Sequence, residues 1–167
     1  GSSILCRLFS RALRLGKLGH AALSDSALAE YTAGLIALSG CRHGAIARAL
    51  LAREQQQAIH TAVRYADMFG HERFFLELQR HHERNDRYLN AGLKRLGSQL
   101  ELPLIATGNV HYLTPADAHI HDVLTCIRQR LPLELAGNHM RANHEYYFRS
   151  PQDMETLFAA WPQALLN

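Results

Sequence analysis

The stretch LPLIATGNVHYLTP, residues 102–115, determines how the rest of the chain is interpreted. It begins as a short apolar run typical of a buried β-strand. It ends with Thr114 and Pro115, a pair that favours a helix N-terminus. Between the strand and the helix lie an amide, Asn109, and an imidazole, His111. Polar side chains at the exit of a buried strand indicate either a turn or a functional site.

The same order of strand and helix recurs along the chain. Strands are predicted at residues 34–40, 74–79, 102–107 and 145–149. Helices are predicted between them, because apolar residues there recur at helical spacing. This alternation predicts an α/β fold of parallel βα units. Apolar residues at successive positions of 34–40 further suggest a strand that is covered on both faces.

Two predicted helices carry clear apolar stripes. One lies near the N-terminus, and its stripe consists of Leu5, Leu8, Phe9, Ala12 and Leu13. The other begins at Thr114, and the residues expected to face the core are Ile120, Val123, Leu124 and Ile127. We expect three parts: an N-terminal helical segment (1–33), the βα units (34–149) and a C-terminal helix (150–167) that leads toward a further domain.

Composition indicates a folded chain of 167 residues, with 47% hydrophobic and 20% charged residues. The formal charge of +3 is compatible with a polyanionic partner but is far below that of a nucleic-acid-coating tail. Three widely spaced cysteines without a CxxC pair suggest reduced thiols and a cytoplasmic protein. The sequence contains no apolar run near the roughly 18 residues of a membrane span, so we expect no membrane association.

Ligand-type side chains follow three successive predicted strands. Cys41 follows the first, His81 the second, and Asn109 and His111 the third. Because the carboxyl ends of parallel strands meet at one edge of a sheet, these side chains are expected on a common rim. Thiolate and imidazole suit zinc and similar metals. The alternatives are a packed thiol at Cys41, a turn at Asn109 and structural histidines.

Four segments in order, GLIALSGCRHG, FFLELQRHH, LPLIATGNVHYLTPADAHIHDVLTCIRQ and EYYFRSPQDMETLF, resemble one known family. They resemble the second half of the PHP (polymerase and histidinol phosphatase) domain of bacterial C-family DNA polymerases, such as DNA polymerase III alpha subunits. The wording is closest to the error-prone branch. The resemblance implies roughly half of a distorted (β/α)7 barrel, preceding the polymerase body, with zinc or manganese at the strand ends of the complete domain.

Carried onto this sequence, the family's ligands correspond to Cys41, His81, Asn109 and His111. Asn109 stands where metal-binding members have aspartate, and the family's opening His-x-His is absent from this sequence. An amide is a neutral and weaker ligand than a carboxylate. The metal site of this chain is therefore expected to be incomplete.

Three functions follow as hypotheses. The first is a structural piece of a DNA polymerase that copies damaged template, inactive in isolation. The second is a metal-dependent phosphoesterase or 3′–5′ exonuclease. The third is a module that only binds DNA or protein, with Arg42, Arg80 and Arg128 as candidate phosphate contacts.

The resemblance also implies partners: the remainder of the polymerase chain, primer-template DNA, a sliding clamp and mutagenesis accessory proteins. Half a barrel would moreover expose a sheet edge, which predicts self-association of the chain.

Overall fold

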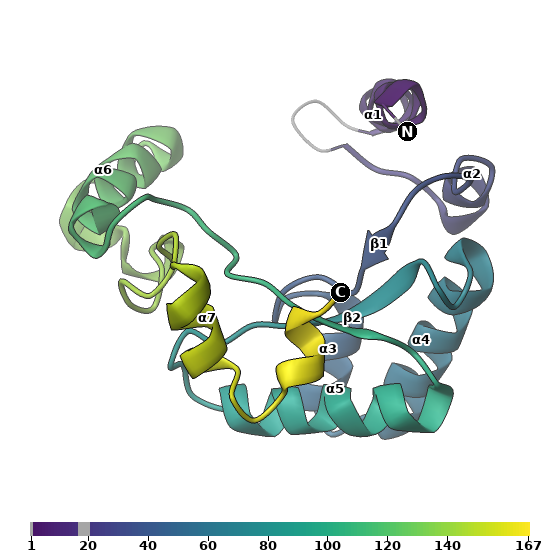
Figure 1. The fold of residues 1–167 in the computed structure, drawn as a ribbon. Helices are drawn as coiled ribbons and strands as arrows, with labels where there is room; N and C mark the ends of the chain where they lie inside the picture. The colour runs from purple at the N-terminus through teal and green to yellow at the C-terminus, as the bar shows by residue number, and fades with distance from the viewer. Residues whose placement is uncertain (1, 17–20) are drawn as a thin grey trace.

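A computed structural model describes residues 2–16 and 21–167. Its centre is a parallel sheet of β1 (Ala37–Leu38), β2 (Phe74–Leu78) and β3 (Leu104–Ala106), arranged in the order β1-β2-β3. Helices α3 (Ala45–Leu51) and α4 (Gln55–Phe69) connect β1 to β2, and α5 (Asp86–Leu100) connects β2 to β3 (Figure 1). The predicted α/β class with parallel βα units is confirmed.

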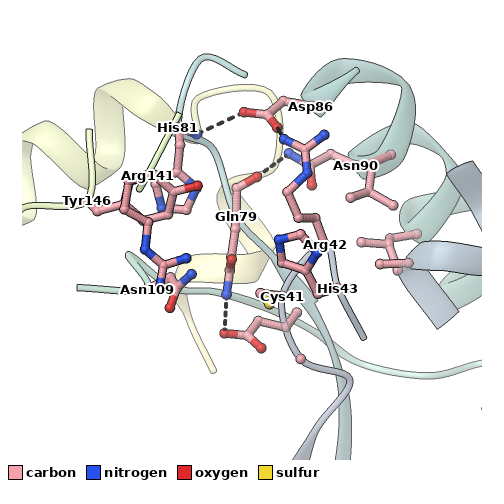
Figure 2. Close-up of a pocket in the computed structure, with 15 residues that line it drawn as sticks. Cys41, Arg42, His43, Gln79, His81, Asp86, Asn90, Asn109, Arg141 and Tyr146 are labelled. Carbon is pink, nitrogen blue, oxygen red and sulfur yellow. Dashed lines mark hydrogen bonds and ion pairs between the residues drawn. The ribbon is translucent and has the colours of Figure 1, made fainter. Parts of the chain in front are cut away.

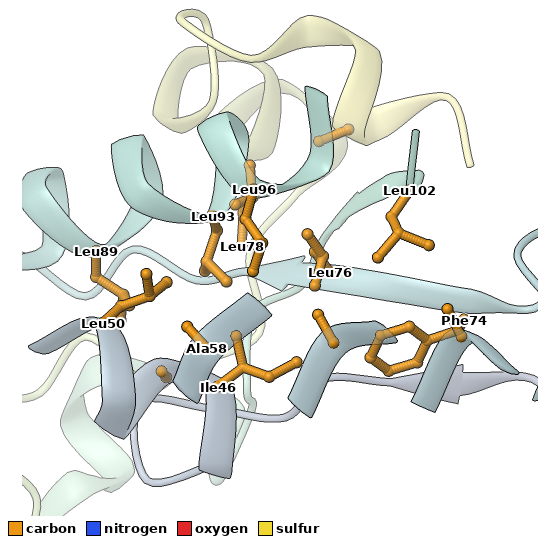
Figure 3. Close-up of a cluster of buried hydrophobic side chains, with 14 of the residues drawn as sticks. Ile46, Leu50, Ala58, Phe74, Leu76, Leu78, Leu89, Leu93, Leu96 and Leu102 are labelled. Atoms are coloured by element: carbon orange, nitrogen blue, oxygen red, sulfur yellow. The ribbon is translucent and has the colours of Figure 1, made fainter. Parts of the chain in front are cut away.

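The hydrophobic core lies between the sheet and helices α3, α4 and α5 (Figure 3). Side chains alternate between the two faces of a strand, so Phe74, Leu76 and Leu78 of β2 point together into this core and are almost fully buried. The intervening Phe75 and Glu77 occupy the opposite face. Within the described residues, α3, α4 and α5 therefore cover the face that carries Phe74, Leu76 and Leu78, whereas the opposite face carries the carboxylate of Glu77.

The terminal helices precede and follow the βα units, and two of them begin next to a capping serine. At the N-terminus these are α1 (Ser2–Leu15) and α2 (Asp25–Ala29), and the Oγ of Ser24 caps α2 by accepting a bond from the Ala27 N–H at 3.2 Å. At the C-terminus, α7 (Pro151–Leu157) begins with a reciprocal capping box between Ser150 and Asp153. Short 3₁₀ helices complete the chain: η1 (Pro115–Asp117), η2 (Leu133–Leu135), η3 (Gly137–His139) and η4 (Pro162–Leu165).

One expectation about the core is wrong. The four apolar residues of α6 (Ala118–Gln129) that were expected to face the core are 51–67% exposed: Ile120, Val123, Leu124 and Ile127. The physical reason is the position of the helix, which stands well away from the sheet and its covering helices (Figure 1). Part of the α1 stripe is likewise exposed, since only Leu8 and Ala12 of its five apolar residues are buried.

Two predicted strands also need correction. Residues 145–149 form no strand of the sheet, and a single parallel bridge joins Tyr147 to Tyr112. Segment 34–40 contributes only two strand residues, and Ile36 is 69% exposed rather than covered. Within residues 2–16 and 21–167, the sheet has no further strand beside β1 or beside β3, so segment 34–40 lies at one open edge and residues 145–149 make only the bridge to Tyr112 beyond the other. In the same part of the chain, no helix has the length and apolarity needed to cross a bilayer.

Candidate functional site

A pocket forms where the strands end, as the order of the elements requires. Cys41 enters it from the loop after β1, His81 from the loop after β2, and Asn109 from the segment after β3 (Figure 2). The tertiary fold thus brings together three of the four side chains that sequence placed on one rim. His111 is set back from the pocket, with its ring edge-on to that of Tyr146 at a centroid distance of 5.8 Å.

His81 is held rigidly and kept neutral. Its ring stacks on Tyr146 at a centroid distance of 3.9 Å, and its Nε2 lies 2.9 Å from the carbonyl oxygen of Gly108. Burial is the largest influence on this group and lowers the pKa of His81. In the neutral ring, Nε2–H donates to the carbonyl, which leaves the lone pair on Nδ1 as an acceptor. Metal-binding histidines are commonly oriented by such a bond, so His81 fits the role of a ligand.

His111 does not fit that role. A guanidinium nitrogen of Arg141, Nη2, lies 2.7 Å from the Nε2 of His111, and the same guanidinium sits over the Tyr146 ring at 5.0 Å. A guanidinium has no acceptor, so it must donate, and the Nε2 lone pair is engaged by a positive charge. Burial, followed by the charge of Arg141, lowers the pKa of His111. Asn109 adds a neutral amide on backbone with φ +42°, the conformation of a turn.

A charged network on the far side of the pocket fixes the loop after β2. One carboxylate oxygen of Asp86 accepts bonds from the backbone N–H groups of His81 and Glu83, at 2.9 and 3.0 Å. Arg42 pairs with Glu83 and lies 3.8 Å from Asp86, while the hydroxyl of Tyr146 donates to Glu83. These bonds orient the His81 backbone and place Tyr146 against the imidazole.

Two of the three arginines proposed as phosphate contacts are engaged within the protein. Arg42 belongs to the network just described, and Arg80 donates through Nη1 to the carbonyl of Leu157 at 2.8 Å. Arg128 is exposed on α6. The structure does not gather these three guanidinium groups on the pocket, which is lined by Arg42 and Arg141 instead.

Several side chains of the site were not predicted from the sequence, namely Gln79, Asp86, Arg141 and Tyr146. Glu77 accepts bonds from Gln79 at 2.8 Å and Thr107 at 2.5 Å. A carboxylate within an apolar strand must be paired if it is buried, which favours a structural salt bridge for Glu77. Glu77 is buried, and the partners found for it are these two hydrogen-bond donors. Arg141 and Tyr146 lie more than fifty residues beyond His81, and no local pattern connects them.

The pocket is small. The volume of the cavity that is accessible to the centre of a water-sized sphere is about 20 Å³. A single water needs on the order of 10–15 Å³ measured in this way, so the cavity admits one water or ion. A nucleotide or a phosphodiester is larger than this cavity.

Because burial lowers the pKa of His81, the free energy of unfolding should depend on pH. The folded chain has a lowered pKa for His81, so below pH about 6.5 the unfolded chain binds a proton that the folded chain resists. The free energy of unfolding should therefore fall as pH decreases through that region. We expect His81→Gln to flatten this slope in urea titrations between pH about 7 and 5, with His111 supplying the remaining slope. The exposed His60→Gln is the matched control, and an equal slope in both variants would contradict the assignment.

The sequence of this chain is similar to those of known proteins. The sequence profile of the PHP domain family matches residues 1–81. The chain is 39% identical over 142 residues to an error-prone DNA polymerase of Symbiobacterium thermophilum, covering 85% of this chain and 13% of that protein. It is 33% identical over 150 residues to a DNA polymerase III subunit alpha of Saccharopolyspora erythraea, covering 90% of this chain and 13% of the relative.

A more distant relative extends this coverage. A DNA polymerase III subunit alpha of Treponema pallidum is 30% identical over 160 residues, covering 96% of this chain and 14% of the relative. The chain thus spans about one seventh of the length of the proteins that it matches.

Proposed function

Because the chain is a PHP domain fragment homologous to the PHP region of DNA polymerase III alpha subunits and error-prone DNA polymerases, we propose that it is a structural segment of such a polymerase. In this proposal the parent protein synthesises DNA across damaged template, and this segment forms roughly half of the distorted (β/α)7 barrel. Residues 1–33, 34–149 and 150–167 serve as its helical entry, its βα units and its connection to the polymerase body.

The contact between Arg141 and His111 is the main observation that supports a structural rather than a catalytic role for this segment. The Nη2 of Arg141 lies 2.7 Å from the Nε2 of His111 and so occupies the lone pair that a metal ligand would need. A fixed positive side chain thereby stands in for a mobile cation at this histidine. The cavity of about 20 Å³ supports the same conclusion, because hydrolysis of a phosphodiester requires more room.

A resident metal belongs, in this proposal, to the complete PHP domain. Cys41, with its Sγ, and His81, through its Nδ1, have donor groups suited to zinc or manganese. Asn109 and His111 fit less well, for the reasons given above. When bound, such a metal would supply Lewis-acid chemistry. The residues present here supply only part of its coordination sphere.

The exposed apolar faces of α1 and α6 support a partner that covers them. We propose that the remainder of the polymerase chain does so. In this proposal, primer-template DNA, a sliding clamp and mutagenesis accessory proteins contact this segment only as part of the parent polymerase, and the parent acts in the cytoplasm.

In isolation, the chain should self-associate through the exposed apolar faces of α1 and α6 and the open edge of β1. Light scattering should show an average mass that rises with concentration, and a constant monomer mass at high concentration would refute this expectation.

A nucleotide assay tests the structural role directly. The purified chain should neither extend a primer with deoxynucleotides nor shorten its 3′ end, with magnesium, zinc or manganese present. A bacterial error-prone DNA polymerase run in parallel confirms that the assay works. Incorporation by the chain alone would overturn the proposal.

A second candidate function, a metal-dependent phosphoesterase or 3′–5′ exonuclease, is favoured by one observation. The neutral His81, with Nε2 bonded to Gly108, has the orientation of a metal ligand. If this function were correct, Arg141→Ala would free His111 and raise manganese-dependent release of nucleotides above that of the unaltered chain. No release from either form would leave the structural role as the better account.

The DNA-binding candidate receives less support from the geometry, because Arg42 and Arg80 are bonded within the protein. If the chain did bind DNA, its affinity for primer-template DNA should fall steeply as the salt concentration rises.

A further inference from the structure

Two histidines and one aspartate gather outside the pocket, where α6 meets the loop that follows η3. His119 and Asp122 lie on α6, and His144 lies in the loop. The nitrogen and oxygen atoms that each could offer to a metal all lie within 4.8 Å of one another. From this geometry we propose that His119, Asp122 and His144 bind one divalent transition-metal ion, with zinc as the best match.

The spacing on the helix is the first argument. Positions three apart lie on the same helical face, so His119 and Asp122 project toward one point. His121 falls on another side and packs against His111 and Tyr112, with ring centroids at 5.3 and 5.7 Å. The helix therefore presents one imidazole and one carboxylate together, a pair of ligands that zinc accepts.

The fixed position of His144 is the second argument. Its ring meets that of His119 edge-on, at a centroid distance of 5.0 Å and an interplanar angle of 82°. Both neighbours in sequence are anchored. Asn143 donates through Nδ2 to the His81 carbonyl at 2.6 Å, and Glu145 pairs with Arg149 at 2.5 Å. These two bonds hold the segment of the loop that delivers the third ligand to α6.

The distances suit a metal after small side-chain rotations. Ligand atoms about 2.1 Å from a tetrahedral zinc lie about 3.4 Å apart, which is compatible with three ligand atoms that all lie within 4.8 Å of one another. His119 and His144 are exposed and Asp122 is half-buried, so their rotamers can adjust. Three ligands leave the fourth position to water.

A neighbouring group is placed to support the carboxylate. The Nδ1 of His121 is buried and, among the described atoms, has no hydrogen-bond partner. It lies 3.9 Å from the Oδ1 of Asp122. With Oδ2 on the metal, Oδ1 is available to accept a bond from His121, the arrangement by which metal-binding carboxylates are usually oriented.

The metal site would join α6 to the loop that follows η3. Helix α6 stands apart from the sheet, and its main neighbours in the described chain are η1, η2 and η3 (Figure 1). A metal shared by α6 and the loop would tie them together and stabilise this end of the molecule, because it binds only the folded arrangement.

Zinc titration of the intact chain tests the proposal. Calorimetry should show one zinc whose affinity falls at least tenfold in His119→Ala and in His144→Ala, and also falls in Asp122→Asn. Two matched variants, His60→Ala and Cys41→Ser, should keep that affinity, since one alters an exposed histidine on α4 and the other alters the pocket. Replacement of zinc by Co²⁺ should give the visible absorption of a tetrahedral site, and this absorption should be lost in His144→Ala.

Thermal unfolding supplies an independent readout. Zinc should raise the Tm of the intact chain and of His60→Ala but leave that of His144→Ala unchanged, while far-UV circular dichroism checks that each variant is folded. Unchanged zinc affinity in His119→Ala and His144→Ala would overturn the proposal. So would the absence of micromolar binding by the intact chain, or loss of the zinc in Cys41→Ser instead. None of these outcomes bears on the nucleotide assay that tests the structural role.

Discussion

Leu76→Ala is expected to lower the free energy of unfolding by about 3–5 kcal/mol, whereas Leu124→Ala should change it by less than about 0.5 kcal/mol. Both leucines occupy positions that sequence patterns assign to the core. Leu76 is 0% exposed, but Leu124 is 60% exposed. Leu76 also packs where α5 approaches the sheet closely, since a Cβ at Gly97 would lie 3.5 Å from its Cδ1. Truncation there leaves a cavity that rigid neighbours cannot fill.

Urea unfolding, followed by circular dichroism at a low protein concentration, measures this difference. The low concentration matters because the apolar face of α6 is proposed to drive self-association. Two similarly destabilised variants would show that α6 packs against the core in solution, and the exposed position of this helix would then be wrong. A small effect of Leu76→Ala would contradict the assignment of β2 to the centre of the core.

Asp86→Ala should be the most damaging single change at the pocket, with a loss of about 2–4 kcal/mol in the free energy of unfolding. Asp86 accepts bonds from two backbone N–H groups and lies 3.8 Å from Arg42. Its removal leaves both donors without their partner, and bonds to a charged group contribute more than neutral ones. The loop that carries His81 contains left-handed backbone at His82 and Asn85, so it depends on such bonds.

Asp86→Asn separates charge from hydrogen bonding. The amide oxygen can still accept from the two N–H groups but no longer attracts Arg42, so the loss should be smaller than for alanine. Asp67→Ala, at an exposed position on α4, provides the control with the same substitution. Equal stability of Asp86→Ala and Asp67→Ala in urea unfolding would contradict the proposed network. The loop should also loosen, which faster amide hydrogen exchange at His81 and Glu83 would show.

The sequence by itself determined the start of two helices and the parallel arrangement of the strands. Helices α2 and α7 begin directly after Ser24 and Ser150, because these serine hydroxyls accept backbone N–H bonds from residues three positions later. This capping requires no other part of the chain. Parallel strands followed from the alternation of strand and helix, and that order also placed Cys41, His81 and Asn109 at one end of the sheet. Each of these features depends on neighbours in sequence or on the topology of βα units.

Only the tertiary structure decided which apolar faces are buried and which distant groups meet. Amphipathic spacing shows that α6 has an apolar side, but the pattern is identical whether a core, a partner or solvent lies beside it. Arg141 reaches His111, and His144 reaches His119, because a loop folds back onto earlier elements. Such contacts join residues more than twenty positions apart, and their geometry depends on the packing of all the segments between them. The sequence could therefore indicate Cys41, His81, Asn109 and His111 as candidate ligands. Which side chains contact them depends on the tertiary structure.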